Sequence, residues 1–149
     1  MNLHDNKKVF RELLEATSDE FNFQPFQVEK DYYVSLFLKN IQDVAPNIVF
    51  KGGTSLSKCY NVIDRFSEDI DLTIYFEEDK LTSGPLRRAQ ESLIKAIKET
   101  IGKLNFTFLN DELEEPIYPK RHFNQYKVGF DRIYQGENDV QMLDHILIE

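Results

Sequence analysis

The 149-residue sequence has one cysteine, no tryptophan and no apolar run long enough to cross a membrane. A membrane-spanning helix needs about 20 consecutive apolar residues, and no stretch approaches that length. Cys59 has no second cysteine in the chain with which to form a disulfide, which fits a reducing compartment. The first ten residues, MNLHDNKKVF, lack the apolar segment of a secretory signal. We therefore expect a cytoplasmic protein that does not use membranes.

Basic residues are also scarce, since 18 lysines and arginines face 26 aspartates and glutamates, for a formal net charge of −8. Proteins that coat nucleic acids need clustered Lys and Arg side chains to contact phosphates. The charge therefore argues against a broad nucleic-acid-binding surface, although it leaves room for a local basic groove. The length fits one domain with a substantial hydrophobic core.

The hydrophobic pattern predicts an α/β (α+β) fold, with a mixed sheet flanked by helices. Two helices come first, over residues 6–21 and 24–44, with Pro25 in the first turn of the second. Their apolar faces are predicted to be Val9, Leu13 and Ala16 in the first helix, and Val34, Phe37, Leu38 and Ile41 in the second. Further helices are expected at 54–60 and 84–102, and strands at 47–50, 69–76, 105–109, 125–133 and 142–148.

A glycine pair, Gly52-Gly53, stands between the first predicted strand and the short helix that follows it. Glycine lets the backbone turn tightly and approach a ligand without a Cβ in the way. The N–H groups at the start of the next helix suit a phosphate. Thr54 and Ser55 add hydroxyl donors, and Lys58 lies one turn further on. A plain strand–helix turn with a hydroxyl cap is the alternative.

An Asp-x-Asp pair follows on the next predicted strand. Residues two apart on a strand face the same side, so Ser67, Asp69 and Asp71 project together. Two carboxylates roughly 6 Å apart repel by about 3 kcal/mol at an effective dielectric constant of about 20. A divalent cation would reverse that penalty, and such oxygen pairs suit Mg²⁺ or Mn²⁺. The alternative is a solvated strand edge whose acids oppose aggregation.

Together, the two elements are more specific than either alone. A turn that holds phosphates, followed by metal-binding carboxylates on the next strand, is what phosphoryl or nucleotidyl transfer requires. Arg65 is a further candidate for phosphate binding, although a salt bridge with a nearby acid explains it equally well. The sequence therefore predicts a nucleotide site built around the segment 52–71.

The segments FKGGTSLSK and RFSEDIDL resemble the first two motifs of the AbiEii/AbiGii toxin family, within the DNA polymerase beta-like nucleotidyltransferase superfamily. VEKDYYVSLFLKNI resembles the family segment that precedes them. The resemblance implies that Asp69 and Asp71 bind catalytic metals. It also implies that the Gly-Gly turn, with Ser55 and Lys58, holds a nucleoside triphosphate.

The resemblance also implies a third carboxylate on a later strand and a helical C-terminal half. The segment HILIE fits the family's strand that ends in an acid, which makes Glu149 the candidate, with Asp131 as the rival and Asp144 as a further option. No helical half follows within the 149 residues. We therefore expect residues 1–149 to be a nucleotidyltransferase domain truncated before that half, with little or no activity by itself.

The resemblance implies a toxin of a bacterial toxin–antitoxin or phage-defence (abortive infection) system. Its partners would be a nucleoside triphosphate, an RNA acceptor of the tRNA kind and an antitoxin protein. Two other functions stay open: nucleotide transfer to a protein side chain, and a non-catalytic module that keeps the fold and binds the antitoxin.

Overall fold

The computed structural model describes residues 2–60, 69–75, 83–109, 125–134 and 144–149. Its helices are α1 (Lys7–Phe21), α2 (Pro25–Val44), α3 (Gly52–Lys58) and α4 (Ser83–Lys103), preceded by the short 3₁₀ helix η1 (Leu3–Asp5). Its strands are β1 (Ile48–Lys51), β2 (Asp69–Ile74), β3 (Thr107–Phe108), β4 (Tyr126–Gly129) and β5 (Ile146–Ile148). None of the described helices is both long and apolar enough to span a membrane.

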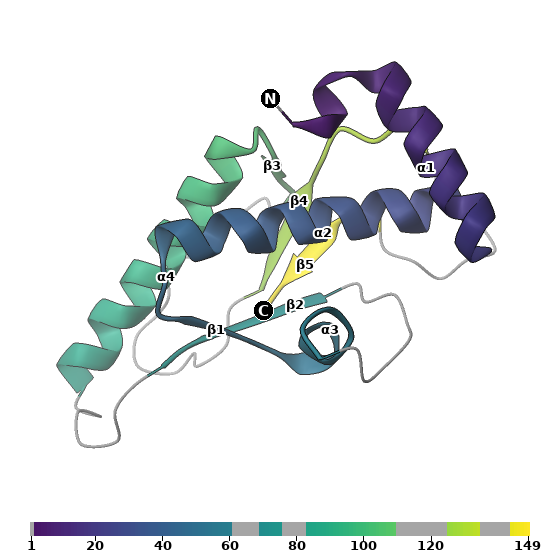
Figure 1. Cartoon of the computed structure of the whole chain (residues 1–149). Helices are drawn as coiled ribbons and strands as arrows, with labels where there is room; N and C mark the ends of the chain where they lie inside the picture. Colours follow the sequence, from purple (N-terminus) through teal and green to yellow (C-terminus); the bar gives the residue numbers. More distant parts are fainter. Residues whose placement is uncertain (1, 61–68, 76–82, 110–124, 135–143) are drawn as a thin grey trace.

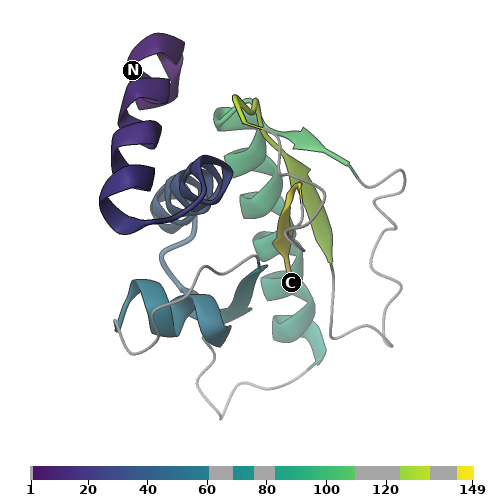
Figure 2. The ribbon, with the colours of Figure 1, turned by 90° about the vertical axis from the view of Figure 1, so that its right-hand side faces the viewer.

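The strands form one mixed sheet in the order β1-β2-β5-β4-β3. The central strands β2 and β5 run parallel, and the other neighbouring pairs are antiparallel. Helices α2 and α4 pack together against one face of the sheet, and α1 packs on α2 (Figures 1 and 2). This arrangement confirms the predicted mixed sheet flanked by helices.

Buried residues of the sheet and of α1, α2 and α4 form the hydrophobic core. Ile70 and Leu72 of β2 are buried in it, as are Ile146 and Ile148 of β5. Because side chains alternate along a strand, Asp69 and Asp71 lie on the opposite face of the sheet. The apolar residues of β2 therefore dictate which way its two acids point.

The predicted face of α2 is confirmed, since Val34, Phe37 and Ile41 are buried and Leu38 is half-buried. The face predicted for α1 is wrong. Val9 and Leu13 are exposed, and the buried residues are Phe10, Leu14 and Ser18. Both sets of residues have helical spacing, and α1 buries the set that contains the large ring of Phe10. This ring packs on Tyr32 and Tyr33 of α2, at centroid distances of 4.8 and 6.0 Å.

Several predicted boundaries also need correction. Helix α3 starts at Gly52 rather than residue 54 and ends at Lys58 rather than residue 60, so the glycine pair forms its first turn instead of a separate loop. Helix α4 runs one residue past Gly102, and the left-handed residue that follows it is Asn105, with φ of 55°. Among the described residues, each of the predicted strands after β1 is shorter than expected.

A buried acid on α2, Glu29, ties this helix to the chain after β4. Its side chain is 1% exposed, and its two oxygens accept hydrogen bonds from the backbone N–H groups of Ile133 (2.6 Å) and Tyr134 (2.9 Å). Burial raises the pKa of Glu29 above its ordinary value of 4.5, against the lowering effect of these two hydrogen bonds. The folded protein therefore holds the Glu29 proton more tightly than the unfolded chain does.

This shift predicts a pH-dependent stability. The stability that the raised pKa of Glu29 adds to the folded state is fully present below pH 4.5. It is lost as the pH rises through the pKa of Glu29 in the folded protein. Glu29→Gln cannot titrate, so the stability advantage of the wild type over this variant should shrink or reverse as the pH rises. Urea unfolding at several pH values measures the difference in the free energy of unfolding between the two proteins, with Glu20→Gln on the exposed side of α1 as control. A stability advantage of the wild type that grows with pH would contradict the expectation.

Candidate active site

The acid pair of β2 lies beside the end of β5. Asp69 pairs in register with Leu147. Just after the end of β5, the backbone N–H of Glu149 donates to the carbonyl of Ile70 (2.9 Å), and its carbonyl accepts from the N–H of Leu72 (2.8 Å). These two hydrogen bonds flank Asp71, so Glu149 is its neighbour across the parallel pair. Neighbours of this kind share a face of the sheet, which puts Asp69, Asp71 and Glu149 on the same side.

The Glu149 carboxylate is bonded to the residue before β4 rather than to the acid pair. It accepts a hydrogen bond from the side-chain amide of Gln125, at 2.9 Å. Within the residues that the structure describes, no three His, Cys, Asp or Glu side chains form a group able to hold a metal ion. The Glu149 backbone is thus in place beside Asp71, and its role as third metal ligand stays a prediction.

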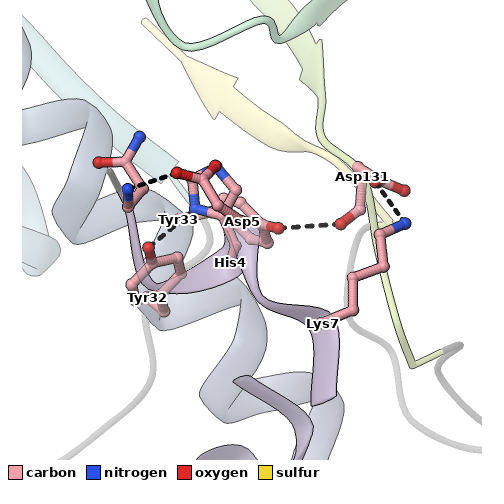
Figure 3. Close-up of polar contacts among 7 residues, drawn as sticks. His4, Asp5, Lys7, Tyr32, Tyr33 and Asp131 are labelled. Carbon is pink, nitrogen blue, oxygen red and sulfur yellow. Dashed lines mark hydrogen bonds and ion pairs between the residues drawn. The ribbon is translucent and has the colours of Figure 1, made fainter. Parts of the chain in front are cut away.

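The rival acids, Asp131 and Asp144, lie toward the other end of β5. Val128 pairs with Ile146, and both acids lie beyond that pair, away from Glu149. Figure 3 shows Asp131 among residues of the N-terminal region: Lys7 forms an ion pair with its carboxylate at 2.8 Å, and the Tyr33 hydroxyl donates to its backbone carbonyl at 2.9 Å.

Asp144 is engaged in a similar way. Its carboxylate lies 2.8 Å from the His145 ring and 3.8 Å from the Arg132 guanidinium. The hydrogen bond from His145 lowers the pKa of Asp144 below its ordinary value. The structure therefore brings one of the three candidate acids, Glu149, to the acid pair of β2.

This placement predicts different outcomes for two substitutions. Glu149→Gln should lower the rate of nucleotide transfer about a hundredfold or more, as expected for loss of a catalytic carboxylate. Asp131→Asn removes only an exposed ion pair, so it should leave the rate near that of the wild type and cost less than about 1 kcal/mol of stability. Transfer rates and thermal unfolding of both variants test this. The opposite ranking of the two rates would make Asp131 the third carboxylate.

The first residue of α3 packs directly against Asp71. Gly52 has a φ of 72°, a left-handed conformation that side chains disfavour. A Cβ added there would lie 1.8 Å from Oδ2 of Asp71 and 2.6 Å from its Cγ. The Asp71 carboxylate therefore occupies the space that any side chain at position 52 would need. Position 52 therefore requires glycine on steric grounds.

The hydroxyl groups predicted to bind phosphate form hydrogen bonds within the protein. Thr54 is 1% exposed, and its hydroxyl donates to the backbone carbonyl of Asp69 at 2.5 Å. Ser55 is 7% exposed, and its hydroxyl donates to the Gly52 carbonyl at 3.1 Å. The nucleotide-binding roles of these residues stay predictions. A phosphate would have to replace the present acceptors.

Lys58, at the end of α3, points its ammonium toward α2. Nζ lies 2.7 Å from the Asp31 carboxylate and 2.8 Å from the Ser35 hydroxyl. This pair ties α3 to α2, so a phosphate would compete with Asp31 for Lys58. Two further predicted residues, Arg65 and Ser67, lie outside the described part of the chain.

The sequence did not single out Lys51, the last residue of β1. It is exposed and pairs in register with Asp71 across the antiparallel strands, which places its side chain on the same face as the acid. Recognising that β1 and β2 pair as neighbours would have revealed it. The candidate site thus combines the two carboxylates of β2, the acid that follows β5, a cation on β1 and the start of α3 at the glycine pair.

Comparison with known proteins adds one finding. A family model described as the nucleotidyl transferase AbiEii toxin of type IV toxin–antitoxin systems matches residues 36–149. The matched range begins within α2 and contains α3, α4 and all five described strands. No curated protein and no solved structure matches the chain.

Proposed function

Because the chain belongs to the AbiEii family of nucleotidyl transferase toxins, we propose that it transfers a nucleotide from a nucleoside triphosphate to an RNA acceptor of the tRNA kind, using Mg²⁺ or Mn²⁺. The observation that supports this most directly is the packing of Gly52 against Asp71, which joins the two predicted motifs in one place. Family membership supports an antitoxin protein as the partner. The cytoplasm is the proposed compartment.

The donor atoms fit a hard divalent cation. Asp69 and Asp71 present carboxylate oxygens on one face of β2, and Glu149, the residue after β5, lies beside Asp71. Mg²⁺ and Mn²⁺ prefer oxygen ligands, and Mg²⁺ is commonly held by one or two carboxylates together with substrate phosphates. When bound, such an ion neutralises charge on the phosphates and polarises them toward attack.

The protein side chains would then position the reactants. An acceptor hydroxyl forms a bond to the α-phosphorus, the bond from that phosphorus to the bridging oxygen breaks, and pyrophosphate leaves. The hydroxyl proton passes to a carboxylate, for which Glu149 is the proposed group, or to water. The start of α3 and Lys51 would hold the triphosphate. Ser55 and Lys58 would be further contacts.

The test uses the protein expressed from its complete gene, incubated with total tRNA, Mg²⁺ and each α-labelled nucleoside triphosphate in turn. We expect label on RNA, and loss of that label with a chelator. Label on protein instead of RNA would favour transfer to a protein side chain. Absence of both transfer and nucleotide binding by the folded protein would contradict the proposal and favour a non-catalytic module that binds the antitoxin.

A further inference from the structure

The hydroxyl of Thr54 connects α3 to the first residue of β2. Its donor–acceptor distance to the Asp69 carbonyl is 2.5 Å, and the side chain is 1% exposed. The hydroxyls of Ser55 and Ser57 bond to carbonyls within α3, and Lys58 bonds to α2. The Thr54 hydroxyl instead reaches the strand that carries both acids. It therefore acts on the backbone of a residue proposed to bind metal.

The sheet explains why the Asp69 carbonyl needs such a partner. Successive carbonyls along a strand point to opposite sides. The Ile70 carbonyl accepts from the backbone N–H of Glu149, the residue after β5, so the Asp69 carbonyl points toward the β1 side. Strand β1 ends at Lys51, opposite Asp71, and the chain there turns into α3. The Thr54 hydroxyl thus supplies a donor where the ladder between β1 and β2 has already ended.

The same helix start also touches the second acid. The Asp71 carboxylate lies against Gly52, two residues before Thr54. Gly52, the first residue of α3, therefore contacts the side chain of Asp71. Thr54, the third residue, contacts the backbone of Asp69. The first turn of α3 therefore contacts both acidic residues of β2.

From this geometry we infer that Thr54 is a positioning residue, which holds the backbone of Asp69 so that its carboxylate is aimed correctly for the metal. The inference rests on the proposed function. It assigns the Thr54 hydroxyl to the protein's own carbonyl rather than to the nucleotide. Residues that orient metal ligands typically change metal affinity or activity when they are substituted.

The matched substitutions are Thr54→Val, Thr54→Ser and Thr100→Val, made in the protein expressed from its complete gene. Valine keeps the shape of threonine but lacks the hydroxyl, and serine restores the hydroxyl. Thr100 is a suitable control because it is 0% exposed and its hydroxyl donates to the Ala96 carbonyl within α4, at 2.8 Å. Both valine variants lose a buried hydroxyl–carbonyl hydrogen bond, but only one of these bonds involves Asp69.

The primary measurement is calorimetric titration with Mn²⁺ alone. We expect Thr54→Val to raise the Kd for Mn²⁺ about 10- to 100-fold, the range typical for loss of a group that orients a ligand. Thr54→Ser and Thr100→Val should bind Mn²⁺ like the wild type. Thermal unfolding should show losses of a few degrees in both valine variants, about what one lost hydrogen bond causes in a domain of this size. In transfer assays, Thr54→Val should lower kcat more than it changes KM for the nucleotide.

Equal Mn²⁺ affinity in wild type and Thr54→Val would overturn the inference, as would equal weakening by Thr100→Val. Thr54→Ala takes the place of the valine variant if that variant does not fold. A folded wild type that neither binds Mn²⁺ nor transfers nucleotide would overturn the proposed function, and this inference with it. Binding by the wild type distinguishes the two failures.

Discussion

Asp69→Asn and Asp71→Asn are each expected to reduce nucleotide transfer at least about a thousandfold, while the variants fold as the wild type does. A thousandfold loss corresponds to about 4 kcal/mol of transition-state stabilisation, a reasonable value for removing a carboxylate that holds a catalytic metal. Asparagine has nearly the same shape as aspartate and can form similar hydrogen bonds, so packing should change little. Neutralising one acid also removes repulsion within the pair, so stability should be equal to the wild type or higher.

Transfer rates and thermal unfolding, measured on the same preparations, separate catalysis from folding. Asp19→Asn is the control, since this acid is exposed on α1, away from the sheet. It should leave both measurements unchanged. Near-wild-type transfer by a folded Asp69→Asn or Asp71→Asn protein would exclude that residue as a metal ligand.

Gly52→Ala is expected to lower the free energy of unfolding by at least about 2 kcal/mol and to abolish most nucleotide transfer. The left-handed conformation, with φ of 72°, costs a residue with a Cβ roughly 1–2 kcal/mol. In addition, the new Cβ would lie 1.8 Å from Oδ2 of Asp71, so that carboxylate has to move. Displacing Asp71 should reduce transfer to near the level of the Asp71→Asn protein.

Gly102→Ala provides a matched control in α4. A Cβ there would meet nothing within 4 Å. Alanine is favoured over glycine in a helix, so this protein should be as stable as the wild type or up to about 1 kcal/mol more stable, with normal transfer. Urea unfolding and the transfer assay test both variants. A Gly52→Ala protein with wild-type stability and activity would show that the turn adapts to a side chain and does not depend on glycine.

Much of the architecture was predictable because it follows from local patterns. The apolar periods of α2 and α4 indicated helices, and the alternation in β2 placed Ile70 and Leu72 on one face and the two aspartates on the other. In α1, by contrast, two helical faces competed, and only packing of Phe10 on Tyr32 and Tyr33 selected the buried one. Periodicity identifies a helix but does not choose between neighbouring stripes of similar hydrophobicity.

For the site, the sequence by itself determined which residues are the candidates: a glycine pair before a short helix, an Asp-x-Asp on a strand and a later acid. It did not single out Gly52 within the glycine pair, and it left three acids as candidates for the third position. Strand order shows which of the three lies beside the acid pair, because parallel pairing of β2 with β5 brings the backbone of Glu149 next to Asp71, while Asp131 forms an ion pair with Lys7. Contacts between residues distant in sequence, such as Thr54 with Asp69 and Lys58 with Asp31, depend on how separate elements pack. Local spacing carries no information about such packing, so only the tertiary structure revealed them.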